Sequence, residues 1–289
     1  MVDLIIFSKD RAFQLYTALE TINKHMSGIN NIFVQFSYSN DKFYKGYQNL
    51  VNKTNCKNIS FIDETEHGFH NTLRALLASE IKTDNIALEV DDSVYYKDID
   101  LAKCSACLDS NEKVGRYLYA GDYKIYGDVF KDINSDGYAL VDRTKKYKPD
   151  VINTCLTYAF NVSSAIHKKE DLIELLATTQ INNPIQLEHK GAESYIFHKY
   201  EETMIHTEEV FKQIHLNNFM KRYEEVEDVE VLNNYFLDNE VIDTNKLDID
   251  SMEMDMRWFN GEDIGRFPIF PWEIPPRYHL DIINNRVKI

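Results

Sequence analysis

The sequence predicts an α/β fold in which helices flank a central sheet. Three observations support this class: short apolar runs of strand length, segments between them whose apolar residues repeat at helical spacing, and the regular alternation of the two over the first 90 residues. Strands joined through helices form right-handed units with parallel strands. The expected strands are 4–7, 31–38, 59–62 and 85–90, and the expected helices are 12–26, 41–51 and 72–81.

The pattern changes after residue 92, and the whole body is expected to form a mixed sheet. Residues 127–149 are polar and contain the turn signal Asp136-Gly137, while Asn182-Asn183-Pro184 is expected to break a helix. The expected helices are 101–108, 169–178 and 191–200, the expected strands are 115–125 and 153–162, and 208–216 is expected to be short and extended.

The charge is unevenly distributed along the chain. The net charge of −15 argues against nucleic acid or an anionic membrane surface as a partner. Residues 201–289 contain 20 acidic and 9 basic residues, whereas residues 1–200 contain 27 and 23. We therefore expect a body over residues 1–217 and an acidic, helical or extended C-terminal appendage over residues 218–289.

The cysteines and the apolar runs indicate a cytoplasmic protein. Cys104 and Cys107 have the CxxC spacing of zinc or redox sites, but no second CxxC follows and both fall in an expected helix, which favours two small buried thiols. The remaining cysteines, Cys56 and Cys155, do not complete a disulfide framework, as expected in a reducing cytosol. No run approaches the ~20 apolar residues of a membrane span, and the first residues lack a basic leader.

Two adjacent carboxylates, Asp91 and Asp92, follow the apolar strand 85–90. Side chains at the carboxyl end of such a strand lie where open α/β sheets bind ligands. Two like charges in contact disfavour joint ionisation unless a cation joins them. Mg²⁺ typically takes one or two carboxylates together with phosphate oxygens, so the pair predicts a metal–diphosphate site. The alternative is a solvated acidic turn after a core strand.

Two stretches, Leu4–Leu15 with Ser8-Lys9-Asp10-Arg11 and Leu88–Val94 with Asp91-Asp92, resemble the GT-A nucleotide-sugar glycosyltransferases, in particular family 2-like members. The resemblance covers about residues 1–215. It implies a GT-A-like, Rossmann-type mixed sheet with a nucleotide-binding half (1–100) and an acceptor half (101–217). It also implies a metal-dependent, inverting glycosyltransferase. Such an enzyme moves a sugar from a nucleoside diphosphate donor to a glycan or other hydroxyl acceptor.

The resemblance also implies roles for the residues at the metal. Asp92 is expected to bind Mn²⁺ or Mg²⁺, and Asp91 is expected to face the ribose or the water shell of the metal. Glu89 shares a face with Asp91 and is either an acid behind the ligands or a buried acid paired with Lys or Arg. His215 is expected to complete the metal site, which would favour Mn²⁺, with His206 less favoured.

On the nucleotide side, Ser8, Lys9, Asp10 and Arg11 are expected at the base and ribose. Arg11 has the alternative of a salt bridge at the start of a helix. Further along the chain, Asp63 is expected near the base, and Arg74, six residues after Gly68, is expected at phosphate or uracil oxygens or is an ordinary surface arginine.

An inverting transferase needs a carboxylate that deprotonates the acceptor hydroxyl. Glu193 is the candidate, at the expected start of a helix, and Glu188 is the reserve. The alternative for Glu193 is an acid in the first helical turn that stabilises the helix dipole.

Two other functions compete with the transferase. A sugar-phosphate nucleotidyltransferase is disfavoured because no glycine-rich phosphate loop follows the first strand. A non-catalytic glycan-binding or assembly protein on a transferase scaffold is kept open by Ser194, which stands where the family usually has a second acid. The segment 267–276, rich in proline and aromatic residues, is expected to lie extended across the body or to form an acceptor wall.

Overall fold

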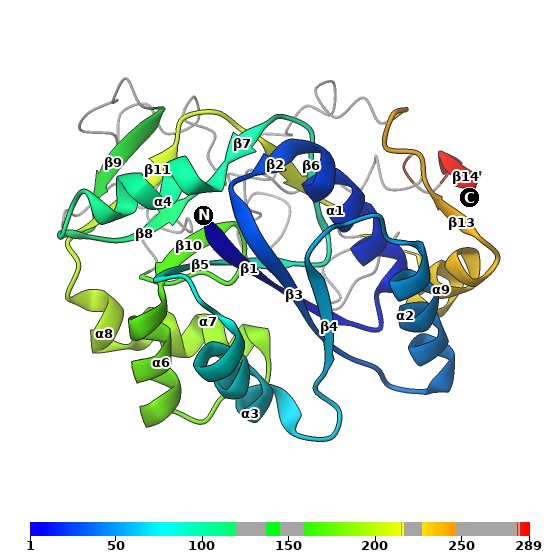
Figure 1. Cartoon of the computed structure of the whole chain (residues 1–289), viewed down its shortest axis with the longest axis horizontal. Helices are drawn as coiled ribbons and strands as arrows, with labels where there is room; N and C mark the ends of the chain where they lie inside the picture. The colour runs from blue at the N-terminus through cyan, green and yellow to red at the C-terminus, as the bar shows by residue number, and fades with distance from the viewer. Residues whose placement is uncertain (120–136, 145–158, 215, 217–226, 247–281, 283) are drawn as a thin grey trace, which may run out of the picture.

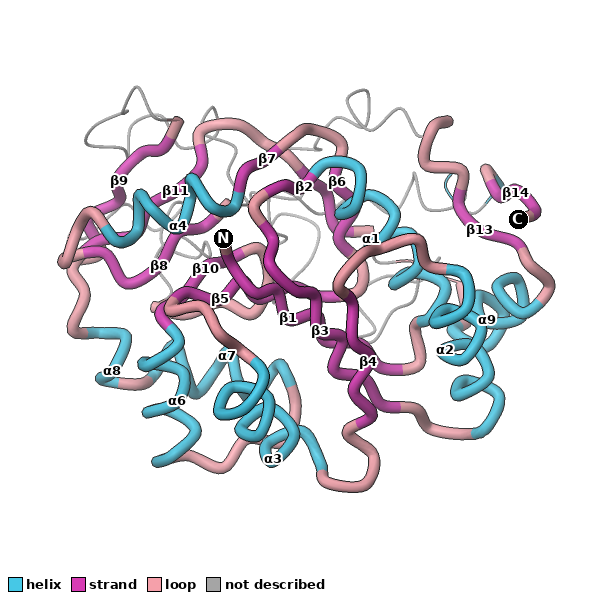
Figure 2. The backbone as a smooth tube through the Cα atoms, viewed as in Figure 1, coloured by secondary structure: helices cyan, strands magenta, loops and turns pink. Residues whose placement is uncertain are grey.

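The computed structural model describes residues 1–119, 137–144, 159–214, 216, 227–246, 282 and 284–289. Its centre is an eight-stranded sheet with the order β4-β3-β1-β5-β10-β8-β11-β9 (Figures 1 and 2). The strands are β1 (Val2–Lys9), β3 (Ile29–Ser37), β4 (Ile59–Asp63), β5 (Asn85–Val90), β8 (Val114–Leu118), β9 (Tyr138–Asp142), β10 (Ala165–Lys168) and β11 (Glu202–His206).

The expected mixed α/β class is confirmed. Strands β4, β3, β1 and β5 are parallel neighbours, as the alternating pattern predicted. Strand β10 is antiparallel to both β5 and β8, so it joins the parallel half to the second half of the sheet. Three two-stranded sheets accompany the main one: β6 (Ser93–Tyr95) with β12 (Phe211–Gln213), β2 (Met26–Ser27) with β7 (Ile99–Asp100), and β13 (Glu240–Ile242) with β14 (Arg286–Lys288).

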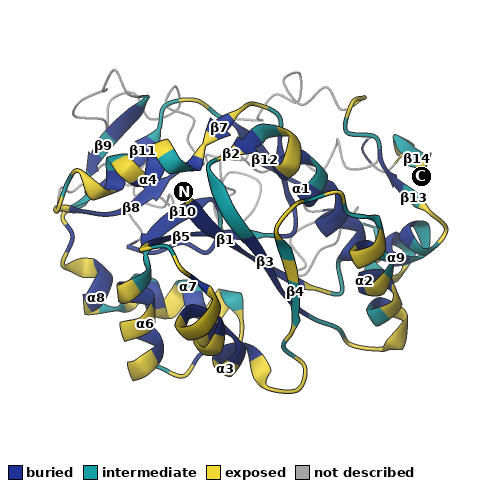
Figure 3. Cartoon of the chain, in the orientation of Figure 1, coloured by how far each residue is buried: buried dark blue, intermediate teal, exposed yellow. Residues whose placement is uncertain are grey.

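The two faces of the sheet are covered by different helices. Alternate residues of β1 divide between two buried clusters: Leu4 and Ile6 belong to one, Ile5 and Phe7 to the other. The first cluster contains side chains of α1 (Ala12–His25), α2 (Asp41–Lys53), α4 (Leu101–Asp109) and α9 (Val229–Leu237), and the second contains side chains of α3 (Gly68–Ala75), α6 (Lys169–Thr178), α7 (Pro184–Glu193) and α8 (Tyr195–His198). Figure 3 shows the strands buried between helices whose outer surfaces are exposed.

The expected helix over 191–200 is found only in part, because its residues are divided between two helices. Helix α7 begins at Pro184, with Asn183 as its N-cap, and ends at Glu193, and the short helix α8 follows Ser194. The physical reason is that Asn followed by Pro starts helices, because the Asn side chain accepts from a first-turn amide and Pro suits the first helical position. The expected helix 72–81 is also divided: α3 begins earlier, at Gly68, and continues as a π-helical turn, η1 (Leu76–Glu80).

The expected strand over 153–162 is not found in its described residues. Residues 159–162 have no regular structure, and the strand forms only at β10. Ser164 has a left-handed backbone (φ 54°), which separates the two. The strand expected over 115–125 is confirmed over Gly115–Leu118, and residues 120–125 and 153–158 lie outside the described residues.

The described part of the C-terminal appendage packs on the first half of the chain. In α9, Phe236 is fully buried and its ring lies 5.7 Å from that of Tyr16, while Asn233 donates to the carbonyl of Lys42. The segment 267–276 lies outside the described residues. In the ranges that the structure describes, no helix has the length and apolarity needed to cross a membrane.

Candidate active site

The carboxyl ends of the four parallel strands gather most of the expected site residues. Ser8 and Lys9 end β1, Asp63 ends β4, and Asp91 and Asp92 follow β5 directly. Because these strands belong to one parallel set, their carboxyl ends lie at one edge of the sheet, and residues that follow them lie at that edge too. Asp91 and Asp92 are both buried, with 3% and 5% exposure, so the alternative of a solvated acidic turn is wrong.

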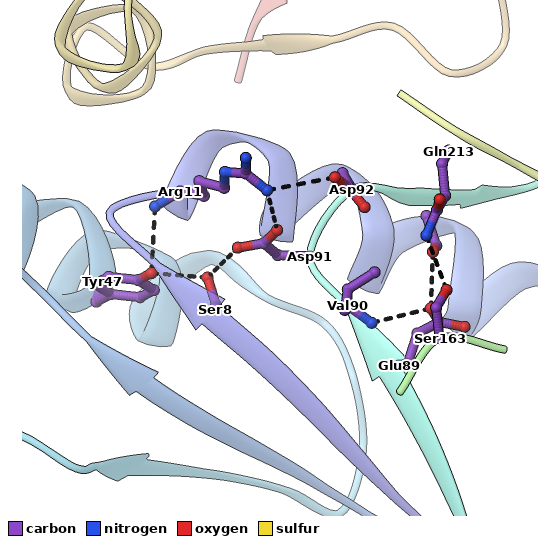
Figure 4. A network of polar contacts seen from close by, with 10 residues as sticks. Ser8, Arg11, Tyr47, Glu89, Val90, Asp91, Asp92, Ser163 and Gln213 are labelled. Carbon is purple, nitrogen blue, oxygen red and sulfur yellow. Dashed lines mark hydrogen bonds and ion pairs between the residues drawn. The ribbon is translucent and has the colours of Figure 1, made fainter. Parts of the chain in front are cut away.

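One arginine joins the two carboxylates (Figure 4). Nη1 of Arg11 lies 3.1 Å from Oδ1 of Asp91 and 3.3 Å from Oδ2 of Asp92. Arg11 stands at the N-cap position of α1, so the alternative of an ion-pairing residue at the start of a helix describes its position. Its partners, however, come from the end of β5 rather than from its own helix.

A chain of hydroxyl groups supports the same pair. Ser8 Oγ donates to Oδ2 of Asp91 at 2.7 Å and lies 2.7 Å from the hydroxyl of Tyr47. Because the single Ser8 proton is given to the carboxylate, the Tyr47 hydroxyl must donate to Ser8. Tyr47 in turn accepts from the backbone N–H of Arg11 at 3.2 Å. The loop after β1 is thereby fixed to Asp91 through both its backbone and its side chains.

Burial and charge act in opposite directions on these groups. Burial raises the pKa of Asp91 and the Arg11 guanidinium lowers it, while the neighbouring Asp92 raises it further, and the net direction is upward. Burial acts to lower the pKa of Arg11, but the charges of Asp91 and Asp92 outweigh it and the pKa is raised. Arg11 therefore stays charged, and the pair lies in a partly neutralised, water-poor setting.

The donor set suits a hard divalent cation. Two carboxylate oxygens from different residues face one common point, which the Arg11 nitrogen marks, and oxygen ligands are those that Mg²⁺ and Mn²⁺ accept. Among the described residues there is no group of three or more His, Cys, Asp or Glu side chains that would complete a metal site from protein alone. Two carboxylates with phosphate and water oxygens are enough for Mg²⁺. His215, the expected additional ligand, lies outside the described residues.

Glu89 follows the first of its two expected alternatives, an acid behind the pair. Its carboxylate is fully buried behind the pair, and among the described residues it is paired with neither Lys nor Arg. It accepts hydrogen bonds from the backbone of Val90 and from hydroxyl groups. Burial raises its pKa, and the hydrogen bonds oppose that rise. The hydroxyl donors are those of Ser93 (2.8 Å), Tyr95, Tyr119 (3.4 Å), Ser163 (3.2 Å) and Ser164 (3.1 Å).

This hydroxyl cluster was missed by the sequence reading. Ser163 also accepts from Gln213 of β12, and the backbone N–H of Ile214 donates to the carbonyl of Asp92 at 2.7 Å. Segments 50 to 122 residues apart along the chain thus meet behind the acidic pair. The available signal was weak: adjacent serines at 163–164 and a tyrosine-rich stretch at 117–123.

The loops beside the pair offer polar groups and aromatic rings. Asp10 has a left-handed backbone (φ 61°), and its carboxylate accepts from both the backbone and the hydroxyl of Ser39 at 2.6 Å. The half-buried rings of Tyr38 and Tyr44 lie 4.7 Å apart next to this loop. Lys9 and Asp63 are exposed at the same edge.

Arg74 and Glu193 are not drawn into this network. Arg74 is exposed, and it lies six residues, about 9 Å, along α3 from the helix start at Gly68. Glu193 is 69% exposed and pairs with Lys190 at 3.1 Å. It ends α7 rather than beginning a helix, so the interpretation as a first-turn acid is wrong.

Glu188, the reserve acid, is more enclosed than Glu193. Its carboxylate accepts from Asn161 Nδ2 at 3.2 Å, and Asn161 belongs to the same segment as Ser163 and Ser164. Burial raises the pKa of Glu188, and Arg116 acts in the opposite direction.

The remaining candidate metal ligands, two cysteines and a histidine, are held in packing and hydrogen-bond contacts. Cys104 and Cys107 lie on α4 as expected, and burial raises the pKa of Cys104 to about 12, so it is not a reactive thiolate. His206 ends β11, and its Nδ1 lies 3.1 Å from the hydroxyl of Tyr117.

Comparison with known proteins supports the expected relationship. No family model matches the sequence. The chain is 26% identical over 219 residues to the bifunctional glycosyltransferase pgtA of Dictyostelium discoideum, and this match covers 66% of the chain but only 28% of that protein. The resemblance to glycosyltransferases is thereby confirmed at the level of sequence, over less than a third of the relative's length.

Likenesses among solved structures are more distant. A mannosyltransferase from Pyrobaculum calidifontis, solved with GDP-Man and Mn²⁺, is 14% identical with a TM-score of 0.39, covering 60% of this chain and 46% of that one. The 4-diphosphocytidyl-2C-methyl-D-erythritol synthase from Anaerococcus prevotii is 14% identical with a TM-score of 0.45, covering 82% and 96%. With TM-scores below 0.5, these likenesses carry no functional assignment.

Proposed function

We propose that the chain is a glycosyltransferase that uses Mn²⁺ or Mg²⁺ and moves a sugar from a nucleoside diphosphate donor to a hydroxyl of a glycan or other acceptor. The observation that carries the proposal is the buried Asp91–Asp92 pair, whose oxygens converge on one cation position at the carboxyl edge of the sheet. The sequence relationship to a glycosyltransferase supports it independently.

The roles follow from position. Asp92 and Asp91 would hold the cation, which when bound would neutralise the charge that develops on the leaving diphosphate. Ser8 orients Asp91 through its hydrogen bond. Lys9 and Asp10, at and just after the end of β1, and Asp63, at the end of β4, lie at the same carboxyl edge of the sheet, which supports a role for them in binding the base and ribose. Arg74 is exposed, so its proposed role is limited to a contact with the donor at the outside of the site.

Glu188 is the better candidate for the acceptor base. In an inverting reaction this carboxylate takes the proton of the acceptor hydroxyl as that oxygen attacks the anomeric carbon. A base benefits from a raised pKa, and Glu188 is enclosed by Asn161, whose segment also supports Glu89. Glu193 is exposed and engaged by Lys190, which favours Glu188 over it.

The test begins with a thermal shift survey of nucleoside diphosphates with Mn²⁺, because a ligand that binds only the folded state raises its apparent stability. The base that stabilises the protein then selects the UDP-, GDP- or dTDP-sugar whose hydrolysis is measured. Asp92→Asn should abolish both the shift and the hydrolysis. The matched control is Asp84→Asn, an exposed acid just before β5, which should leave both unchanged.

Other outcomes overturn the proposal in distinct ways. A nucleotide shift without turnover of any donor would indicate a binding protein. Release of pyrophosphate from a nucleoside triphosphate and a sugar phosphate would indicate a nucleotidyltransferase. Hydrolysis that persists in Asp92→Asn would remove the acidic pair from the reaction.

A further inference from the structure

The acidic pair already contains a cation supplied by the chain itself. A single nitrogen, Nη1 of Arg11, lies within 3.3 Å of an oxygen from each carboxylate. A bridging metal ion would have to bind the same two oxygens. Arg11 and a divalent ion are therefore alternatives at this place, because two positive groups in one buried site repel each other strongly.

The backbone and side chain of Arg11 are held differently. Its backbone is fixed by the hydrogen bond to Tyr47 and by its place at the start of α1. Its side chain remains 15% exposed, whereas those of Asp91 and Asp92 are 4% and 5% exposed. The guanidinium thus lies on the solvent side of this contact, and the two carboxylates lie deeper.

We propose that Arg11 is the resident counter-cation of the Asp91–Asp92 pair and competes with the divalent ion for it. The inference rests on the proposed function for the source of the incoming phosphates. A nucleoside diphosphate brings anionic oxygens that a guanidinium binds in bidentate geometry. When donor and ion bind together, the ion therefore replaces Arg11 at the carboxylates, and the diphosphate replaces the carboxylates at Arg11. The ion alone binds weakly, and ion and nucleotide bind cooperatively.

The direct test measures the affinity for Mn²⁺ alone by titration calorimetry, without any nucleotide. Arg11→Gln removes the competing charge and should bind Mn²⁺ about tenfold more tightly or better, the scale on which one close charge changes cation affinity. Arg11→Lys keeps a competing cation and should stay near the wild type. Lys45→Gln removes an exposed positive charge from α2 and should bind as the wild type does.

An affinity of Arg11→Gln equal to or lower than that of the wild type overturns the inference, as does Mn²⁺ binding to neither protein. Arg11→Lys binding as tightly as Arg11→Gln also overturns it, because charge would then not be the cause. These titrations contain no sugar nucleotide, so a failure of the proposed transfer reaction would leave their result unaffected.

A second measurement on the wild type covers the case that Arg11→Gln does not fold. The Nε–Hε signal of Arg11 in the ¹⁵N spectrum, assigned by its loss in Arg11→Lys, should shift and exchange faster with water once Mg²⁺ saturates the protein. Saturation by Mg²⁺ with an unmoved Arg11 signal would overturn the competition.

Discussion

At the scale of single residues, two buried carboxylates show how ionisable groups in this protein are matched by donors or charges from distant parts of the chain. Asp3 is fully buried at the start of β1 and accepts from Asn30, Asn31 and the loop at Thr83. Asp171 is bound by Lys199 and the hydroxyl of Tyr200. Such pairings are needed because an isolated buried charge is costly. Each group can therefore be tested by removing either its charge or its partner.

The choice between Glu188 and Glu193 is a residue-scale prediction. Glu188→Gln should lower the transfer rate by about 100-fold or more, the usual contribution of a general base. Glu193→Gln should have little effect, because its carboxylate is exposed and paired with Lys190. Transfer rates at saturating donor and acceptor decide this, with thermal unfolding as a check on folding. Equal losses in the two variants would contradict the assignment.

His167 should make the stability of the fold depend on pH. It is fully buried on β10, its Nε2 lies 2.8 Å from the carbonyl of Asn161, and burial lowers its pKa to about 3. Because the pKa of His167 is lower in the folded than in the unfolded protein, the neutral side chain contributes its full share of the unfolding free energy above the unfolded value near 6.5. That share is lost as the pH falls from there toward about 3.

Urea unfolding at pH 7.5 and pH 5.0 tests this. The wild type should lose about 2 kcal/mol more between these pH values than His167→Gln, since each pH unit below 6.5 costs about 1.4 kcal/mol. His67→Gln, at an exposed histidine before α3, should follow the wild type. A parallel loss in His167→Gln would show that other groups cause the effect.

At the scale of elements, Glu89 joins the end of β5 to four other segments, three of them directly. Through hydroxyl groups it contacts the start of β6, the end of β8 and the loop before β10, and through Ser163 it reaches β12. These contacts fix the backbone immediately before Asp91. The acidic pair is therefore positioned by a polar core rather than by an apolar one.

Glu89→Ala and Glu89→Gln separate shape from charge in this core. Glu89→Ala leaves a cavity and several buried hydroxyls without an acceptor, and should cost about 3 kcal/mol or more of unfolding free energy. Glu89→Gln keeps the shape and one acceptor oxygen and should cost clearly less. Glu80→Ala, at an exposed acid on η1, should change stability by less than about 0.5 kcal/mol. Equal costs of the two Glu89 variants in urea unfolding would argue against the hydroxyl cluster.

At the scale of the whole molecule, the described C-terminal elements share a core with the N-terminal ones. Helix α9 packs on α1 and α2, near the paired strands β13 and β14 (Figure 1). Lys53 of α2 reaches both the ring of Phe236 and the side chain of Asn239. The packing of helices α1 and α2 thus depends on residues that lie almost 200 positions later in the chain.

Phe236→Ala tests that dependence. Removing a fully buried ring should cost about 3–5 kcal/mol of unfolding free energy and lower the melting temperature of the entire first half in one transition. Val51→Ala, at a half-exposed position on α2, is the control and should cost far less. A separate early transition that leaves the far-UV signal of the body intact would show that the appendage unfolds independently.

The sequence by itself determined the parts of this protein that depend on local order. Alternating apolar patterns predicted the four parallel strands and their helices, and the strand 85–90 predicted that Asp91 and Asp92 lie at the carboxyl edge of the sheet. The expectation that Ser8 and Asp63 belong to the same site came from the family resemblance. It was misleading where one signal had two meanings, as at Asn183-Pro184, which begins α7 rather than only ending a helix.

Only the tertiary structure decided the contacts between residues far apart in the chain. That Arg11 bridges Asp91 and Asp92 and that Tyr47 completes the link through Ser8 depend on residues 36 to 83 positions apart. Glu89 likewise accepts from Ser163 and Ser164, which lie 74 and 75 positions later in the chain. Periodicity carries no information about such pairs, since it reports only which face of an element is buried. For the same reason, the sequence could not predict that β10 pairs antiparallel to β5 and β8, which brings Ser163 and Ser164 behind the acidic pair.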